Sequence, residues 1–128
     1  AADPAALHRI ATQHRGLPAG GKLAWSFDGP QRAIRCAHAM FAASGGSARI
    51  GAGIHAGEVR RESGALLGEG LDTALTIARS AGPGEVRVSR VVRDLVHGAA
   101  LGFTARDDVR LADGRAIATF ASLPGRDQ

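Results

Sequence analysis

The stretch from residue 68 to residue 90, GEGLDTALTIARSAGPGEVRVSR, constrains the fold most, because a helix pattern and a strand pattern meet across one tight turn. Four apolar residues recur at the spacing of one helix face: Leu71, Ala74, Leu75 and Ala78. The Gly-Pro-Gly at residues 82–84 ends this helix, and the alternation that places Val86 and Val88 inward predicts a strand directly after it. A helix followed at once by a strand favours a layered structure in which helices pack on a sheet.

Two further helices are predicted before this stretch. The first follows Asp3, a plausible N-cap, and stops at Gly16. The second follows Asp28, which we expect to cap it, and stops at Gly45. Its apolar stripe comprises Ala33, Ile34, Ala37, Met40 and Phe41. Between the two helices, residues 17–27 predict a loop or tight hairpin that leads into a short strand.

The remaining segments predict mostly strands. Residues 48–61 are expected to form a strand with three residues inside, namely Ile50, Ile54 and Val59, followed by a turn at ESG. Ser89 is predicted to cap a short helix, and two strands around residues 102–111 and 116–123 are joined by an ADG turn. Because hairpins occur among the connections, we expect a single α+β domain over residues 1–128 with a mixed sheet rather than a doubly wound parallel fold.

Charge and composition narrow the function classes. The net charge is +4 and the sequence pI is near 10.9, but the basic residues are spread along the chain and no set of aromatic residues accompanies them, which argues against a nucleic-acid surface. No apolar run is long enough to span a membrane and no signal-peptide pattern is visible, so a cytoplasmic domain without membrane contact is expected. The single Cys36 is predicted to be a small buried core residue. The five histidines lack zinc-like spacing.

Several stretches, taken in order, resemble the class III adenylate/guanylate cyclase homology domain. FDGPQRAIRCAHAM is similar to the strand-to-helix passage of bacterial members, and RIGAGIHAGEVRR resembles the family's R-x-G-[IV]-H-x-G-E-V segment. LGEGLDTALTIARSAGPGEVRVSRVVRDLV and FTARDDVRLADG resemble two later family segments. The resemblance covers about residues 5–123. It implies a ferredoxin-like α+β core that pairs head to tail, as a homodimer or with a cyclase-like partner domain, with nucleotide sites at the interface.

The same resemblance implies that the substrate-handling positions are replaced. The family's first strand, which carries one metal-binding Asp, would lie before residue 1. The second metal-binding Asp of the family corresponds to Gly21, and the purine-reading residue corresponds to Ala65. The ribose-orienting Asn corresponds to Asp72, the triphosphate-binding Arg to Thr76 and the late Lys to Ala112. Two-metal cyclisation needs acidic ligands for the ions and cations for the developing charge, so no catalytic residue, metal or cofactor is expected here.

The leading hypothesis is therefore a catalytically degenerate cyclase-like domain that serves as a dimerisation or regulatory module in signal transduction, within a larger protein or as a pair. One alternative is an active class III cyclase that makes cAMP from ATP with Mg²⁺ or Mn²⁺. Another is a non-catalytic sensor of a nucleotide or metabolite. His55 and Glu58 are interpreted as packing and hydrogen-bonding residues, and the pair Asp72 and Thr76 as either a solvated helix face or a polar dimer contact.

Overall fold

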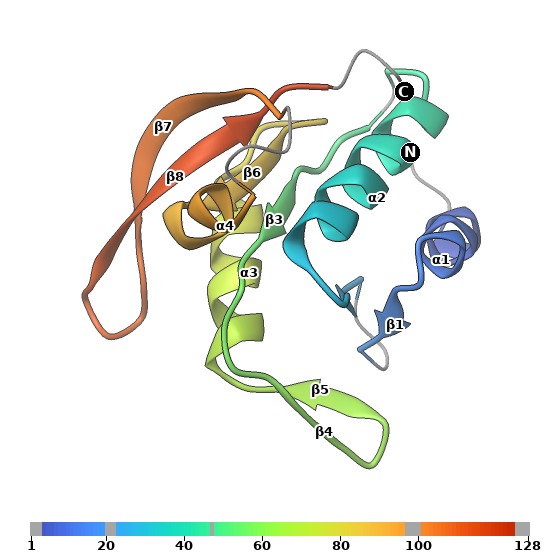
Figure 1. Ribbon diagram of the computed structural model, residues 1–128, viewed down its shortest axis with the longest axis horizontal. Coiled ribbons are helices and arrows are strands. Elements are labelled where there is room, and N and C mark those ends of the chain that lie inside the picture. The colour runs from blue at the N-terminus through green and yellow to red at the C-terminus, as the bar shows by residue number, and fades with distance from the viewer. Residues whose placement is uncertain (1–3, 20–22, 47, 97–100, 125–128) are drawn as a thin grey trace.

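A computed structural model of the chain describes residues 4–19, 23–46, 48–96 and 101–124 (Figure 1). Twelve elements are found in these ranges: α1 (Pro4–Gln13), β1 (Leu17–Pro18), β2 (Trp25–Ser26), α2 (Pro30–Ala43), β3 (Ala52–Ile54), β4 (Arg60–Glu62), β5 (Ala65–Leu67), α3 (Glu69–Ser80), β6 (Val86–Ser89), α4 (Arg90–Leu95), β7 (Phe103–Arg110) and β8 (Ala116–Ser122). None of the helices in these ranges has the length and apolar character needed to cross a membrane.

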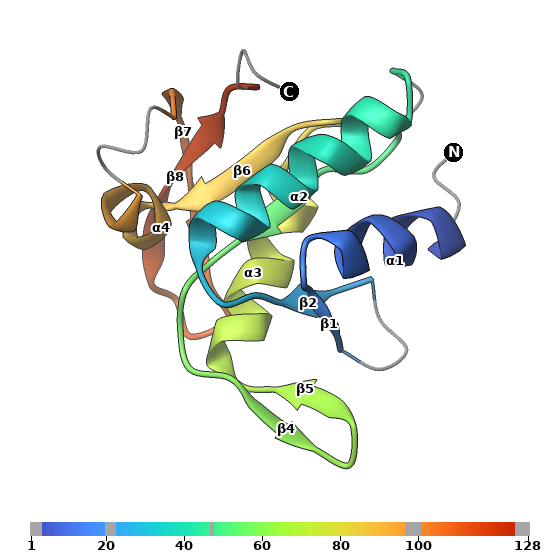
Figure 2. The same ribbon diagram turned by 45° about the vertical axis from the view of Figure 1, so that its right-hand side comes forward.

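The main sheet has four described strands in the order β3-β6-β8-β7. The β3–β6 pair is parallel, with Gly53 opposite Arg87, whereas β6–β8 and β7–β8 are antiparallel. Two short antiparallel hairpins, β1–β2 and β4–β5, stand apart from this sheet (Figure 2). The predicted α+β arrangement with a mixed sheet is therefore confirmed.

Helices cover both faces of the main sheet. Ile54 of β3 packs into a cluster with Ile34 of α2 and Val92 of α4, so these two helices lie on one face. Its neighbour Gly53 points the opposite way, because successive strand residues alternate between faces. A Cβ placed on Gly53 would collide with the backbone of α3 at Ala74 and Ala78, so α3 lies directly against that second face.

The most completely buried part of the core lies where α2 and α4 pack against β6. Ile34, Val88 and Val92 are fully buried there, and Phe120 of β8 packs against them. A second cluster joins α1 to the opposite side of α2; its buried members are Leu7, Ala11, Cys36 and Met40. The predicted burial of Cys36 is confirmed.

Several local expectations hold. The first helix and the β1–β2 hairpin form as predicted, and the side-chain oxygen of Ser89 accepts a hydrogen bond from the backbone N–H of Val92 at 3.3 Å, which caps α4. The turn after the central strand segment forms at Ser63 and Gly64, both with positive φ. The two C-terminal strands and their turn also form. The proposed cap residue Asp3 lies outside the described residues.

Other expectations are wrong. Asp28 does not cap α2: Gly29 occupies the N-cap position and no side-chain cap bond is formed. The long strand over 48–61 is reduced to β3, because the chain leaves the sheet after Ile54 and turns into the β4–β5 hairpin. Ile50 and Val59, expected inside, are 50% and 44% exposed.

The buried face of α3 is also rotated from the one expected. Leu71 is buried as predicted, but Thr73 and Ile77 are the other large residues that the structure buries on this helix. Ala74, Leu75 and Ala78 are only half-buried and line an open groove instead.

Candidate functional site

An apolar groove of about 440 Å³ runs beside β3, between α2 and α3. We call it the β3 groove. The wall on α2 comprises Ala33, Ala37, Met40 and Phe41, and the wall on α3 comprises Leu71, Ala74, Leu75 and Ala78. Its floor is the run of residues 50–57, and the β2 segment closes one end. Figure 2 shows α2 above the β4–β5 hairpin.

The rim of the β3 groove exposes large apolar side chains. Leu23, Ile50 and Val59 all line it, and they are 48%, 50% and 44% exposed. The single tryptophan, Trp25, lies at the closed end, where its indole N–H donates to Nδ1 of His8 at 3.1 Å. Asp28 is the one carboxylate among the described lining residues, so the groove is apolar and nearly uncharged.

His55 links the floor of the groove to the cap of α4. Its Nδ1 is hydrogen-bonded to Oγ of Ser89 at 2.8 Å, and the same Oγ accepts from the N–H of Val92. Burial lowers the pKa of His55, and the negative charge of Glu69 opposes part of that shift. The neutral imidazole is thus favoured, and the interpretation of His55 as a hydrogen-bonding residue is confirmed. Glu58 contributes through its backbone carbonyl, which accepts from the N–H of Gly70 at 2.9 Å, while its side chain is exposed.

Asp72 and Thr76 lie one turn apart on α3, as their spacing predicts. The hydroxyl of Thr76 donates to the backbone carbonyl of Asp72 at 2.9 Å, so it is engaged within its own helix. Asp72 is exposed, and Thr76 is half-buried. The exposure of Asp72 fits a solvated helix face; a contact with a second copy stays a prediction.

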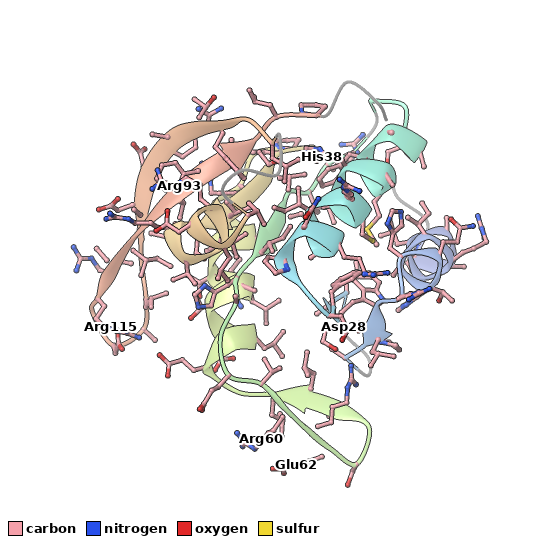
Figure 3. The ribbon with its side chains drawn as sticks, viewed as in Figure 1. Asp28, His38, Arg60, Glu62, Arg93 and Arg115 are labelled. Atoms are coloured by element: carbon pink, nitrogen blue, oxygen red, sulfur yellow. The ribbon has the colours of Figure 1, made fainter. Side chains whose placement is uncertain are left out.

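The tip of the β7–β8 hairpin lies against the start of α3. Arg115 donates to Glu69 of α3 at 2.7 Å and to Asp113 beside it at 2.7 Å. The backbone N–H of Arg115, and after it the guanidinium of the same residue, hold the pKa of Asp113 below its usual range. Figure 3 shows Arg115 at this end of the molecule. The positive charge of Arg115 is therefore already matched by two carboxylates.

The other replaced positions are scattered. Ala65 is half-buried on β5, where it pairs with Glu62, and Ala112 is exposed in the β7–β8 turn. Gly21 lies outside the described residues. The structure thus brings Ala112 to the same end of the molecule as the first turn of α3, through the contact of Arg115 with Glu69. Of the cations at this tip, Arg115 is paired with two carboxylates, and Arg110 donates to the backbone carbonyl of Gly114 at 2.7 Å.

The described residues do not fit a divalent metal pair. Mg²⁺ and Mn²⁺ prefer oxygen ligands, and two-metal catalysis needs carboxylates that converge on both ions. No group of three or more His, Cys, Asp or Glu side chains is placed to hold a metal ion within these residues. No catalytic step is therefore derived through a metal.

Two features were missed by sequence reasoning. His38 was not singled out in the sequence, yet it is 8% exposed and its Nε2 is hydrogen-bonded to Oγ of Ser122 on β8 at 2.9 Å. The β3 groove was missed too, because its walls consist of residues whose helical spacing indicates burial. The signal available in the sequence was the excess of small residues on both walls.

Three solved structures are similar to the chain. A structure titled adenylate/guanylate cyclase/hydrolase from Silicibacter pomeroyi has a TM-score of 0.75 and 22% identity, and the match covers 92% of this chain and 78% of that chain. The adenylyl cyclase CyaB from P. aeruginosa has a TM-score of 0.67 and 13% identity, covering 95% and 79%. The guanylate cyclase domain of RhGC from Catenaria anguillulae, solved in complex with GTP, has a TM-score of 0.69 and 13% identity, covering 95% and 80%.

No protein-family model and no curated protein matches the chain. The likeness is thus one of fold, and it spans nearly all of the chain. The chain therefore has the fold of these adenylate and guanylate cyclase structures.

Proposed function

We propose that this chain is a catalytically degenerate cyclase-like domain that works as a regulatory or dimerisation module rather than as a producer of cyclic nucleotides. The observation that carries the proposal is the polar face of α3. At the positions that resemble the ribose-orienting and triphosphate-binding residues, it presents the exposed carboxylate of Asp72 and the hydroxyl of Thr76, which is bound to its own helix backbone.

Charge decides the chemistry at such a site. Cyclisation of a nucleoside triphosphate develops negative charge on the transferred phosphoryl group, and preorganised cations or metal ions stabilise it. A carboxylate at the same place repels the polyphosphate instead. Arg115, which an ion pair links to the first turn of α3, is already paired with Glu69 and Asp113.

The direct test is an assay of the purified chain with ATP and with GTP, in Mg²⁺ and in Mn²⁺. We expect no cyclic nucleotide above a heat-denatured sample. Formation of cAMP or cGMP that disappears in Asp72→Ala and persists in Asp94→Ala, an exposed carboxylate on α4, would instead establish the alternative of an active cyclase. The same preparations measured by light scattering test the dimer: a monomer at every concentration contradicts the dimerisation part of the proposal.

A second test places a positive charge at residue 76 and removes the negative charge at residue 72. We expect Thr76→Arg, combined with Asp72→Asn, to raise the affinity for ATP by several fold, because repulsion is replaced by attraction. Thr12→Arg is a matched control, since the hydroxyl of Thr12 also donates to the backbone carbonyl four residues before it, at 2.9 Å. Titration calorimetry measures both. Equal ATP binding by the two variants would contradict the placement of the triphosphate position on α3.

The sensor alternative has its own measurement. A panel of nucleotides and cyclic nucleotides is added to the unaltered chain, and the melting temperature is recorded. We expect no shift. A saturable rise with one compound, lost when the groove or the α3 face is altered, would favour a sensor over a purely structural module.

A further inference from the structure

Arg61 of β4 joins the two hairpins that stand outside the main sheet. One Nη atom of its guanidinium donates to the backbone carbonyl of Pro18 at 2.7 Å. The other donates to the carbonyl of Leu17 and to Oγ of Ser26, both at 2.9 Å. Two of these acceptors belong to β1 and one belongs to β2, so a single side chain of the β4–β5 hairpin is bonded to both strands of the β1–β2 hairpin. Figure 2 shows the two hairpins next to each other.

The charge of Arg61 is held differently from that of its neighbour Arg60. Arg60 forms an ion pair with Glu62 on the same strand, at 2.7 Å. The three acceptors of Arg61 are all uncharged oxygens, and no carboxylate of the described residues forms an ion pair with it. The contact therefore depends on the planar fork of the guanidinium, which presents several donors in fixed directions, whereas the ammonium group of a lysine is a single point charge.

An apolar contact lies beside these hydrogen bonds. Ala19, directly after β1, and Leu66 of β5 are 1% and 4% exposed, and they pack in one cluster with Leu71 of α3. Among the described strands, neither hairpin pairs with the main sheet. The two hairpins thus contact each other through polar and apolar groups, and Leu71 joins them to the first turn of α3.

The base of the β4–β5 hairpin is fixed against α3, whereas its outer part is not. At the base, the N–H of Gly70 donates to the carbonyl of Glu58 at 2.9 Å. Beyond this base, residues 59–67 make no backbone hydrogen bond to any other described element. Side chains attach the outer part of the hairpin to the rest of the domain, Leu66 by packing and Arg61 by hydrogen bonds.

We propose that Arg61 is a strap that couples the β1–β2 and β4–β5 hairpins, so that a change of conformation in one hairpin is transmitted to the other. The strap consists of the three hydrogen bonds of Arg61, which join residues 35 to 44 positions apart in the chain. Coupling of this kind is reciprocal, so a contact made with either hairpin affects both. Because β2 closes one end of the β3 groove, the strap also connects the exposed β4 strand to that end of the groove.

Two variants that conserve charge on adjacent residues test the strap. Arg61→Lys keeps the positive charge but loses the fork, and Arg60→Lys is the matched control, since Arg60 bonds within its own strand. The reporter is the amide of Ala19, which donates to the carbonyl of Ala24 across the β1–β2 hairpin at 3.0 Å. We expect hydrogen exchange of this amide, measured by NMR, to be about tenfold faster in Arg61→Lys and unchanged in Arg60→Lys. The amide of Ala52, which is bonded to Glu85 beside the main sheet, is expected to keep its rate in both variants.

A further variant tests the transmission between the hairpins. Gly64 lies in the β4–β5 turn with a φ of 82°, a conformation that β-branched residues avoid, and a Cβ added to it meets nothing within 4 Å. Gly64→Val therefore strains the turn without a clash. We expect it to speed exchange of the Ala19 amide when Arg61 is present and to have no further effect in the Arg61→Lys background, because the strap is then already broken. A residue that only added stability would give two independent effects that add.

The strap is also measurable in the unaltered chain. Both Nη atoms of Arg61 are bonded, so rotation of its guanidinium should be slow. We expect two separate Nη signals for Arg61 in NMR spectra recorded in the cold, assigned by their loss in Arg61→Lys. Arg35, which is exposed on α2 and has no hydrogen bond to the described residues, is expected to give one averaged signal.

Four results would overturn the proposal. Equal exchange of the Ala19 amide in Arg61→Lys and Arg60→Lys would mean that Arg61 does not hold the β1–β2 hairpin. An equally large acceleration at Ala52 would mean a general loss of stability rather than a local strap. Additive effects of Gly64→Val and Arg61→Lys would mean that nothing is transmitted. One averaged Nη signal for Arg61 would mean that its hydrogen bonds do not persist in solution. None of these results depends on cyclase activity.

Discussion

Similar apolar residues are buried to very different extents on the two sides of β3. On the side of β6, Ile34, Val88 and Val92 are fully buried, because a neighbouring strand and two helices enclose them. On the other side, Ile50 and Val59 are half exposed at the rim of the β3 groove. Within the described residues, β6 is paired with a strand on both edges, whereas β3 is paired on one edge alone and the space beside its other edge is open.

The largest expected effect contrasts one isoleucine on each side. Ile34→Ala creates a cavity in the sealed region and is expected to lower the free energy of unfolding by about 2–5 kcal/mol. Ile50→Ala, at a residue 50% exposed, is expected to cost less than about 1 kcal/mol. Urea denaturation of the two variants measures both. Equal costs would mean that the groove is closed in solution.

A second contrast tests whether α3 is tightly held although it borders the groove. Gly53→Ala places a methyl group against the backbone of α3 at Ala74 and Ala78, so it is expected to destabilise by roughly 1–3 kcal/mol. Gly82→Ala is the control, since nothing lies within 4 Å of its added Cβ. Thermal unfolding of the two variants measures the difference in their stability. A neutral Gly53→Ala would show that α3 moves freely away from β3.

We expect the free energy of unfolding to fall in acid because of two histidines, His38 and His55. Burial lowers the pKa of His38, which is bonded to Ser122, and burial, partly opposed by Glu69, lowers that of His55. Below pH 6.5 the unfolded chain therefore binds more protons than the folded one, and stability falls as the pH drops toward the folded pKa values. The slope is at most about 1.4 kcal/mol per pH unit for each histidine.

Melting curves from pH 7.5 to pH 5, in steps, measure this slope. His38→Asn is expected to remove the part of this slope that comes from His38. A stability profile that is flat across this range in the unaltered chain would contradict the buried, neutral state of both imidazoles.

The last prediction concerns the chemical reactivity of the Cys36 thiol rather than the stability of the fold. Burial raises the pKa of the Cys36 thiol to about 11, and the residue is 1% exposed although it borders the groove. From the thiolate fraction alone, alkylation by iodoacetamide at pH 8 should be roughly a hundredfold slower in the folded chain than in urea. Rapid labelling of the folded chain would mean that α1 separates from α2 and exposes Cys36.

Local sequence patterns were sufficient for most elements. Ser89 was recognised as a cap from its place before an apolar run, and Ser63 and Gly64 were recognised as a turn, although the hairpin that this turn closes was not predicted. The prediction for Asp28 was wrong because Gly29 precedes Pro30, so the cap position shifted by one residue. Of the site, the helical spacing of Asp72 and Thr76 was predicted, whereas the bond of that hydroxyl to its own backbone was not.

By itself, the sequence determined the helices, the position of most strands and the resemblance of the chain to cyclase domains. Those properties follow from neighbours three or four residues apart, or two apart in a strand. Only the tertiary structure decided which apolar residues are buried and that β3 keeps a free edge. Burial depends on what packs against a face, and in this fold that partner is supplied by residues far away in the chain, or, beside β3, by none of the residues that the structure describes.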